Sequence, residues 1–88
     1  MKSHLLFTEE GWEDYLWFQN NDRKLLKRIN KLLKNAKRTP SEGLGKPEPL
    51  RENLSGYWSR RISDKHRLVY GVRETELVII SCRFHYQK

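Results

Sequence analysis

Residues 23–37 read RKLLKRINKLLKNAK and predict the helix on which the rest of the domain must pack. Apolar side chains recur at the i, i+3, i+4 spacing of an amphipathic helix and form one stripe: Leu25, Leu26, Ile29, Leu32, Leu33 and Ala36. Basic side chains cover the remaining surface. That basic side is either a solvated face or a surface that contacts the phosphate backbone of a nucleic acid.

A strand and a further helix are expected before this stretch. The short apolar run of residues 5–7 suits a strand. Thr8 then supplies an N-cap oxygen, and two acidic residues follow where they favour a helix start. Large side chains continue at helical spacing, so this helix should end near residue 20. Asn20, Asn21 and Asp22 are placed to break it and can cap the next helix.

Residues 39–49 read TPSEGLGKPEP, in which Pro and Gly are placed to prevent regular structure. We expect a loop, stiffened by Pro40, Pro47 and Pro49. Glu48 lies between two of these prolines and has little conformational freedom. Such stiffness is what a positioned catalytic base requires, although stiff linkers are common in other proteins.

Three strand-like segments close the chain, at residues 57–62, 66–72 and 77–84. The short intervals between them suit hairpin turns. We therefore expect one α+β domain over residues 1–88, with element order β-α-α-β-β-β. Its small sheet should be antiparallel, mixed at the first strand, with both helices packed on one face and the other face open.

The charge balance points to a polyanionic partner. Lys and Arg number 18 against 11 Asp and Glu, which gives a net charge of +7 at pH 7. Such a field favours nucleic acid, an anionic membrane or an acidic protein. No stretch approaches the length of a membrane span, the N-terminus lacks a signal-peptide pattern, and a single cysteine favours a reducing compartment. A cytoplasmic protein is expected.

Strand alternation predicts an arginine-rich face on the sheet. We expect the faces that carry Arg61, Arg67 and Arg83 to coincide on a concave, basic, partly aromatic surface. The planar guanidinium group binds two phosphate oxygens at once, and neighbouring aromatic rings stack on single-stranded bases. The alternative is that these arginines pair on the surface with carboxylates such as Glu52, Asp64 or Glu74.

The three histidines, His4, His66 and His85, show no metal-ligand spacing. We expect no metal site and no cofactor, and Cys82 should be a small core residue rather than a nucleophile. His66 is equally compatible with a structural role. His85 lies in the terminal FHY sequence, where an imidazole that titrates near neutral pH can donate a proton to a leaving oxygen.

Longer motifs resemble the YoeB branch of the RelE-type toxins. They are KPEPL at 46–50, NLSGYWSRRI at 53–62, HRLVY at 66–70 and CRFHY at 82–86. The resemblance extends back through WEDYLWFQ and the basic second helix, so it covers nearly the whole chain. It implies the toxin of a type II toxin–antitoxin system: a ribosome-dependent mRNA interferase that is inhibited by a YefM-type antitoxin and forms a homodimer.

The resemblance also implies a role for each matching residue. Glu48 is the general base on the ribose 2′-hydroxyl, and Arg61 and Arg67 hold the scissile phosphate. His85 protonates the leaving 5′-oxygen, and Tyr86 positions the RNA. Further phosphate contacts are expected at Lys46, Arg51 and Arg83.

This chemistry recruits neither metal nor water, because attack by the neighbouring 2′-oxygen is intramolecular. It leaves a 2′,3′-cyclic phosphate or a 3′-phosphate end. Gln87 and Lys88 extend beyond the terminal HY at which the family usually stops. Their effect on the placement of Tyr86 does not follow from the sequence.

Two other classes of function fit the same composition. A non-catalytic RNA- or ribosome-binding module would use the same arginines and aromatic residues but would not need Glu48 and His85. A pure interaction protein would neutralise an acidic partner and cleave no RNA in any context.

Overall fold

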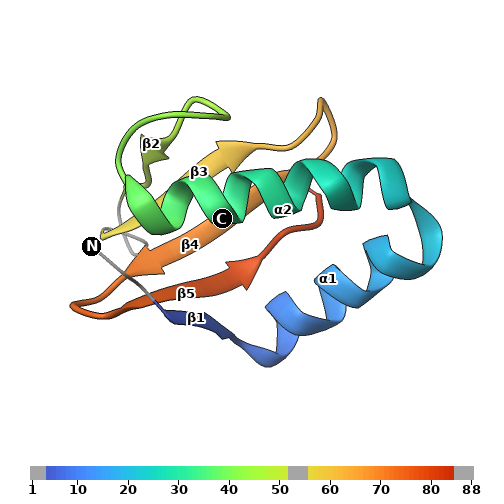
Figure 1. The fold of residues 1–88 in the computed structure, drawn as a ribbon, viewed down its shortest axis with the longest axis horizontal. Helices are drawn as coiled ribbons and strands as arrows, with labels where there is room; N and C mark the ends of the chain where they lie inside the picture. Colours follow the sequence, from blue (N-terminus) through green and yellow to red (C-terminus); the bar gives the residue numbers. More distant parts are fainter. Residues whose placement is uncertain (1–3, 52–55, 85–88) are drawn as a thin grey trace.

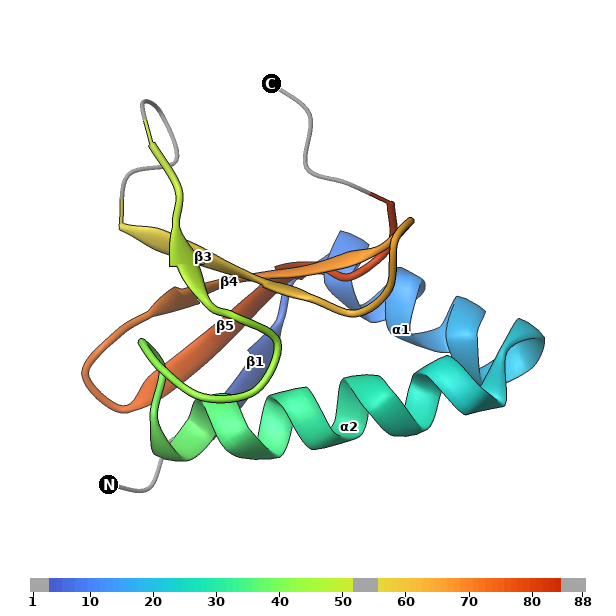
Figure 2. The ribbon, with the colours of Figure 1, turned by 90° about the horizontal axis from the view of Figure 1, so that it is seen from above.

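A computed structural model describes residues 4–51 and 56–84 of the chain (Figure 1). The elements in order are β1 (His4–Phe7), α1 (Glu9–Asn21), α2 (Arg23–Arg38), β2 (Glu48–Pro49), β3 (Tyr57–Arg61), β4 (Arg67–Val72) and β5 (Glu76–Ser81). Figure 2 shows both helices on one side of the sheet, with the opposite face open. The expected α+β fold is confirmed.

Both helices begin at the caps that the sequence predicts. The Thr8 hydroxyl accepts a hydrogen bond from the Gly11 N–H at 3.1 Å, and the Asp22 carboxylate accepts one from the Leu25 N–H at 3.1 Å. Each cap satisfies a backbone donor that has no partner within its own helix. α1 ends at Asn21, one residue beyond the predicted position.

The apolar stripe of α2 forms the centre of the core. Ile29, Leu32 and Ala36 have no solvent exposure, and Leu33 is also buried. They belong to one cluster with Phe18 of α1 and four sheet residues: Leu68, Tyr70, Leu77 and Ile79. The clear 3.6-residue period therefore identified the buried face of α2 correctly.

The sheet has the order β1-β5-β4-β3-β2. β1 runs parallel to β5, whereas the other neighbouring pairs are antiparallel, so the expectation of a mixed first strand is confirmed. The β4–β5 pairing contains a register shift at Val69 and Tyr70. The first strand of the chain thus joins the sheet beside the last.

Two predictions about the strands are wrong by more than one residue. Glu48–Pro49 was expected to lie in a loop but forms β2, which pairs with β3 and makes the sheet five-stranded. Proline is tolerated there because β2 is an edge strand. The last strand was expected to continue to residue 84, but it ends at Ser81, and the next backbone N–H, that of Cys82, donates to the Asp14 carboxylate at 3.1 Å.

Candidate functional site

Glu48 and Arg67 meet on the open face of the sheet. Arg67 Nη2 donates to Glu48 Oε1 at 3.2 Å, and Arg67 Nε donates to Ser59 Oγ at 3.0 Å. The Arg67 side chain is 20% exposed and the Glu48 side chain 64%. The guanidinium group is therefore held in place, while the carboxylate remains accessible to a ligand.

β3 sets the distance between these groups. Glu48 of β2 is opposite Ser59 in the register, and Arg67 of β4 is opposite Arg61. Ser59 and Arg61 lie two residues apart on β3 and therefore on the same face. Three neighbouring strands thus bring a carboxylate, a hydroxyl and two guanidinium groups to one region of the sheet.

Arg61 lies on the predicted face but is paired. Its guanidinium group donates to the Asp64 carboxylate in the following turn. The side chains of Arg61 and Asp64 are 53% and 93% exposed. This is the surface pairing that the sequence left open as the alternative for Arg61. Such exposed pairs contribute little stability, so an incoming anion can compete for Arg61.

Lys46 and Arg51 lie on either side of β2, and both are exposed. The Lys46 backbone has a φ of 51°, and the carbonyl of the preceding Gly45 accepts a hydrogen bond from the Arg61 N–H at 2.8 Å. The chain is thus attached to the end of β3 immediately before it enters β2. Both cations border the segment that carries Glu48.

The structure does not bring Arg83 to this group. Its guanidinium carbon lies 3.9 Å from the ring centre of Trp17 on α1 and 4.6 Å from that of Phe84. The expectation that the faces of Arg61, Arg67 and Arg83 coincide is therefore wrong for Arg83. Strand alternation does not apply at residue 83, because β5 has already ended at Ser81.

His85 and Tyr86, with Gln87 and Lys88, lie outside the described residues. The described chain ends at Phe84, whose carbonyl accepts a hydrogen bond from the Arg67 N–H at 3.1 Å. Phe84 itself donates its N–H to His66 Nδ1 at 2.8 Å. The backbone of Phe84, which precedes His85, is therefore attached to His66 and to Arg67, the first residue of β4.

A buried arginine that the sequence analysis overlooked supports the loop before β2. Arg60 has no solvent exposure, and its Nε donates to the Tyr70 hydroxyl at 2.8 Å. Tyr70 in turn donates to the Pro40 carbonyl at 2.6 Å. The other Arg60 donors bond at 2.6–3.1 Å to Asn35 Oδ1 and to the carbonyls of Leu44, Thr39 and Glu42. In the sequence, strand alternation places Arg60 on the same face as the apolar Trp58 and Ile62, and this position indicates a buried side chain.

Burial shifts the pKa values of Asp14, Tyr70 and Cys82 in the direction that favours their neutral forms. Burial, together with the nearby Asp14 carboxylate, raises the pKa of the Cys82 thiol to about 12. Cys82 is thus a protonated core residue at neutral pH, as expected. Burial also raises the pKa of Asp14 and that of Tyr70. Within the described residues, no group of three or more His, Cys, Asp or Glu side chains could hold a metal ion.

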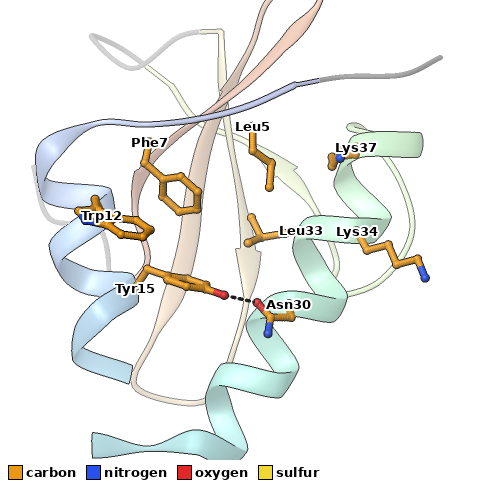
Figure 3. A pocket seen from close by; sticks show the side chains of 8 residues that line it. All are labelled: Leu5, Phe7, Trp12, Tyr15, Asn30, Leu33, Lys34 and Lys37. Carbon is orange, nitrogen blue, oxygen red and sulfur yellow. Dashed lines mark hydrogen bonds between the residues drawn. The ribbon is translucent and has the colours of Figure 1, made fainter. Parts of the chain in front are cut away.

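A separate hollow of about 480 Å³ opens between β1, α1 and α2 (Figure 3). It is lined by Leu5, Phe7, Trp12, Tyr15, Asn30, Leu33, Lys34 and Lys37. The Tyr15 hydroxyl bridges the two helices by donating to Asn30 Oδ1 at 2.7 Å. The hollow is thus mainly apolar, with lysines on its α2 side, and its lining residues were not predicted to form a site.

Comparison with known proteins gives consistent matches over the length of the chain. Residues 7–86 match the family described as YoeB-like toxin of bacterial type II toxin-antitoxin system. Toxin YoeB of Synechocystis sp. is 66% identical over 84 residues, which cover 96% of this chain and 98% of that protein. Among the described residues, no helix is long and apolar enough to cross a membrane.

Two solved structures from Staphylococcus aureus share the fold. A YoeB dimer has a TM-score of 0.90, and a heterotetrameric YoeB–YefM toxin–antitoxin complex has a TM-score of 0.87. Each is 48% identical, with 98% of this chain and 100% of the other chain covered. The chain therefore belongs to the YoeB-like toxin family of bacterial type II toxin–antitoxin systems.

Proposed function

We propose that this toxin is an endoribonuclease that binds the ribosome and cleaves mRNA in the decoding region. The reaction is attack of a ribose 2′-hydroxyl on the adjacent phosphate. The observation that carries the proposal is the 3.2 Å contact between the exposed Glu48 carboxylate and the Arg67 guanidinium group. It provides a base for the 2′-hydroxyl and a fixed cation for the phosphate within one site.

Arg67 has enough donors to hold the carboxylate and the phosphate together. A guanidinium group carries five N–H bonds, of which one is used by Ser59 and one by Glu48. The others can bind phosphate oxygens, on which negative charge grows during the reaction.

The remaining roles follow from the family motifs. Arg61 is the second phosphate ligand, and Lys46 and Arg51 contact the RNA on either side of Glu48. His85 is the general acid, and Tyr86 positions the RNA. Arg83 is not part of this proposal, because its guanidinium group packs on Trp17.

The test uses purified toxin, translating ribosomes and a defined mRNA whose cut ends are mapped. We expect upstream fragments that end in a 2′,3′-cyclic phosphate or a 3′-phosphate. A matched mRNA with a single 2′-deoxyribose at the cut site should resist cleavage there, because it lacks the attacking oxygen. Ribosome binding without any cleavage would contradict the proposal and support a non-catalytic ribosome-binding module.

We also propose that an acidic, YefM-type antitoxin is the partner and that the toxin can form a homodimer. Both assemblies are described for the Staphylococcus aureus relatives. The net charge of +7 supports attraction of an acidic chain. The hollow is a suitable binding place for the antitoxin. Its aromatic lining can take a large apolar side chain of the antitoxin, and Lys34 and Lys37 on its α2 side can attract acidic residues of the antitoxin.

A pair of exposed apolar residues tests this binding place. Trp12 lines the hollow and is 46% exposed, whereas Leu44 lies outside it and is 44% exposed. Trp12→Ser should weaken binding of the cognate antitoxin by roughly 10-fold or more, as expected for an aromatic anchor. Leu44→Ser should not. Equal affinities for the two variants in a calorimetric titration would place the antitoxin elsewhere.

A further inference from the structure

The end of β5 leads into a short segment that is attached at each of its three residues. The Cys82 N–H donates to the Asp14 carboxylate at 3.1 Å. Arg83 lies over the rings of Trp17 and Phe84. Phe84 donates its N–H to His66 Nδ1 at 2.8 Å and accepts a hydrogen bond from the Arg67 N–H at 3.1 Å.

The Phe84 backbone has a φ of 66°, in the left-handed region that a bulky side chain rarely adopts. Such a conformation persists only where surrounding contacts determine it, and these conformations cluster at functional sites. Both backbone polar groups of Phe84 are held, one by the His66 ring and one by the Arg67 amide. These two hydrogen bonds define the direction of the chain at its last described residue.

The His66 ring is fixed as a hydrogen-bond acceptor. His66 is only 6% exposed, and its ring packs edge-to-face on Phe18 with centroids 5.0 Å apart. Trp17 and Phe84 contact the same ring at centroid distances of 6.3 Å and 5.7 Å. Accepting the Phe84 N–H requires that Nδ1 carry no proton. The ring therefore holds one backbone donor from a rigid position.

The same residue pair connects this attachment to the candidate site. His66 Nδ1 accepts a hydrogen bond from the Phe84 N–H. The next residue, Arg67, donates its backbone N–H to the Phe84 carbonyl and its side chain to Glu48. His85 follows Phe84 by one peptide bond. Any change in the Phe84 backbone therefore changes where the chain continues relative to Arg67.

We propose that His66 is a positioning residue for cleavage: it fixes the backbone of Phe84, the residue that precedes His85 in the sequence. The inference rests on the proposed function, in which His85 is the general acid. In this role His66 acts through the Phe84 N–H, which donates to its Nδ1.

Two substitutions separate the acceptor from the ring. His66→Phe keeps an aromatic ring for Phe18 and Trp17 but removes the acceptor. His66→Asn removes the ring but keeps a side-chain oxygen near the position of Nδ1. The matched control is His4→Asn, which changes the exposed histidine of β1.

Cleavage on ribosomes and hydrogen exchange of the Phe84 amide are measured for each protein. His66→Phe should lower kcat by about 10- to 100-fold with little change in KM, because the general acid is displaced while binding persists. Its Phe84 amide should exchange faster than in the wild type. His66→Asn should retain most of kcat and slow exchange, and His4→Asn should match the wild type.

The reverse order, in which His66→Phe cleaves normally and His66→Asn does not, would show that His66 serves ring packing and would overturn the inference. An equal loss of kcat in both variants, with unchanged hydrogen exchange of the Phe84 amide, would also overturn the inference. If the wild type fails to cleave on ribosomes, the proposed function itself is wrong. The exchange measurement then still reports whether His66 holds the Phe84 amide.

Discussion

Arg67 makes two contacts that impose different demands on its side chain. Ser59 fixes Nε from within the sheet, and Glu48 takes Nη2 at the exposed edge. A planar fork meets both demands at once, whereas an ammonium group has a single nitrogen. The local geometry therefore depends on an arginine at this position as well as on its positive charge.

Glu48→Gln should reduce the cleavage rate by about 10²- to 10⁴-fold, because the amide cannot accept the 2′-hydroxyl proton as a general base. The substitution keeps the size of the side chain and its ability to accept a hydrogen bond from Arg67. Single-turnover cleavage on ribosomes measures the effect. The control is Glu42→Gln, an exposed glutamate in the preceding loop, and wild-type cleavage by Glu48→Gln would remove Glu48 from the mechanism.

Arg67→Lys should lower kcat by roughly 100-fold despite the retained charge, because one ammonium group cannot bind Ser59 and Glu48 in the same geometry and also grip the phosphate. The measurement is the same single-turnover assay. If Lys supports wild-type cleavage, the role of this position is only electrostatic attraction.

The raised pKa of Cys82 predicts a loss of stability in alkali. In the unfolded chain the thiol ionises near its ordinary pKa of 9.0, whereas in the folded chain the pKa is about 12. The unfolding free energy should therefore fall as pH rises through this window, by about 1.4 kcal/mol per pH unit from Cys82 alone. Below the unfolded pKa, Cys82 should cause no such dependence.

Urea unfolding at a series of alkaline pH values tests this, with Cys82→Ala as the comparison. In the alanine variant, the free energy of unfolding should depend less steeply on pH, because the contribution of Cys82 is gone. The contribution of Tyr70, whose pKa burial also raises, should remain. Parallel slopes in the two proteins would show that the buried thiol is not the group responsible.

At the scale of elements, both helices were predicted because their caps and apolar periods are local features of the sequence. β2 was not, because a two-residue strand with a proline exists only through its pairing with β3. Alternation correctly placed Arg61 and Arg67 on one face, but it failed for Arg83, since no local signal marks the end of β5 at Ser81. Glu48 was identified by its motif, whereas its contact with Arg67 required the tertiary pairing of three strands.

The loop between α2 and β2 depends on two buried side chains, so its stability can be tested separately from the site. Tyr70→Phe removes the donor to the Pro40 carbonyl and the acceptor of Arg60 Nε. We expect a loss of about 1–3 kcal/mol in the free energy of unfolding, because buried partners are left unsatisfied. Urea denaturation measures it. Tyr57→Phe, on the open face, should change stability by less than about 0.5 kcal/mol, and equal effects would contradict the assigned network.

At the scale of the whole molecule, the excess of positive charge is concentrated on α2, which packs on one face of the sheet (Figure 2). Glu48 pairs with Ser59 of β3 and lies on the other face. The sequence left open whether this surface is only solvated or contacts phosphates. If the basic surface of α2 contacts ribosomal RNA, it contributes to binding but not to the chemical step.

Reversing the charge of two exposed α2 residues, Lys27→Glu with Lys31→Glu, separates these possibilities. If α2 contacts ribosomal RNA, KM for ribosomes should rise by roughly 10-fold or more while kcat stays constant. The difference from the wild type should shrink as salt is added, because counterions screen the same contacts. An unchanged KM would identify the surface as a solvated face.

The parallel pairing of β1 with β5 has a consequence for the synthesis of this toxin. Residues 4–7 find their strand partner only in residues 76–79, near the opposite end of the chain. A nascent polypeptide still lacking those residues cannot complete the five-stranded sheet, and β1 has no strand partner until β5 has been synthesised.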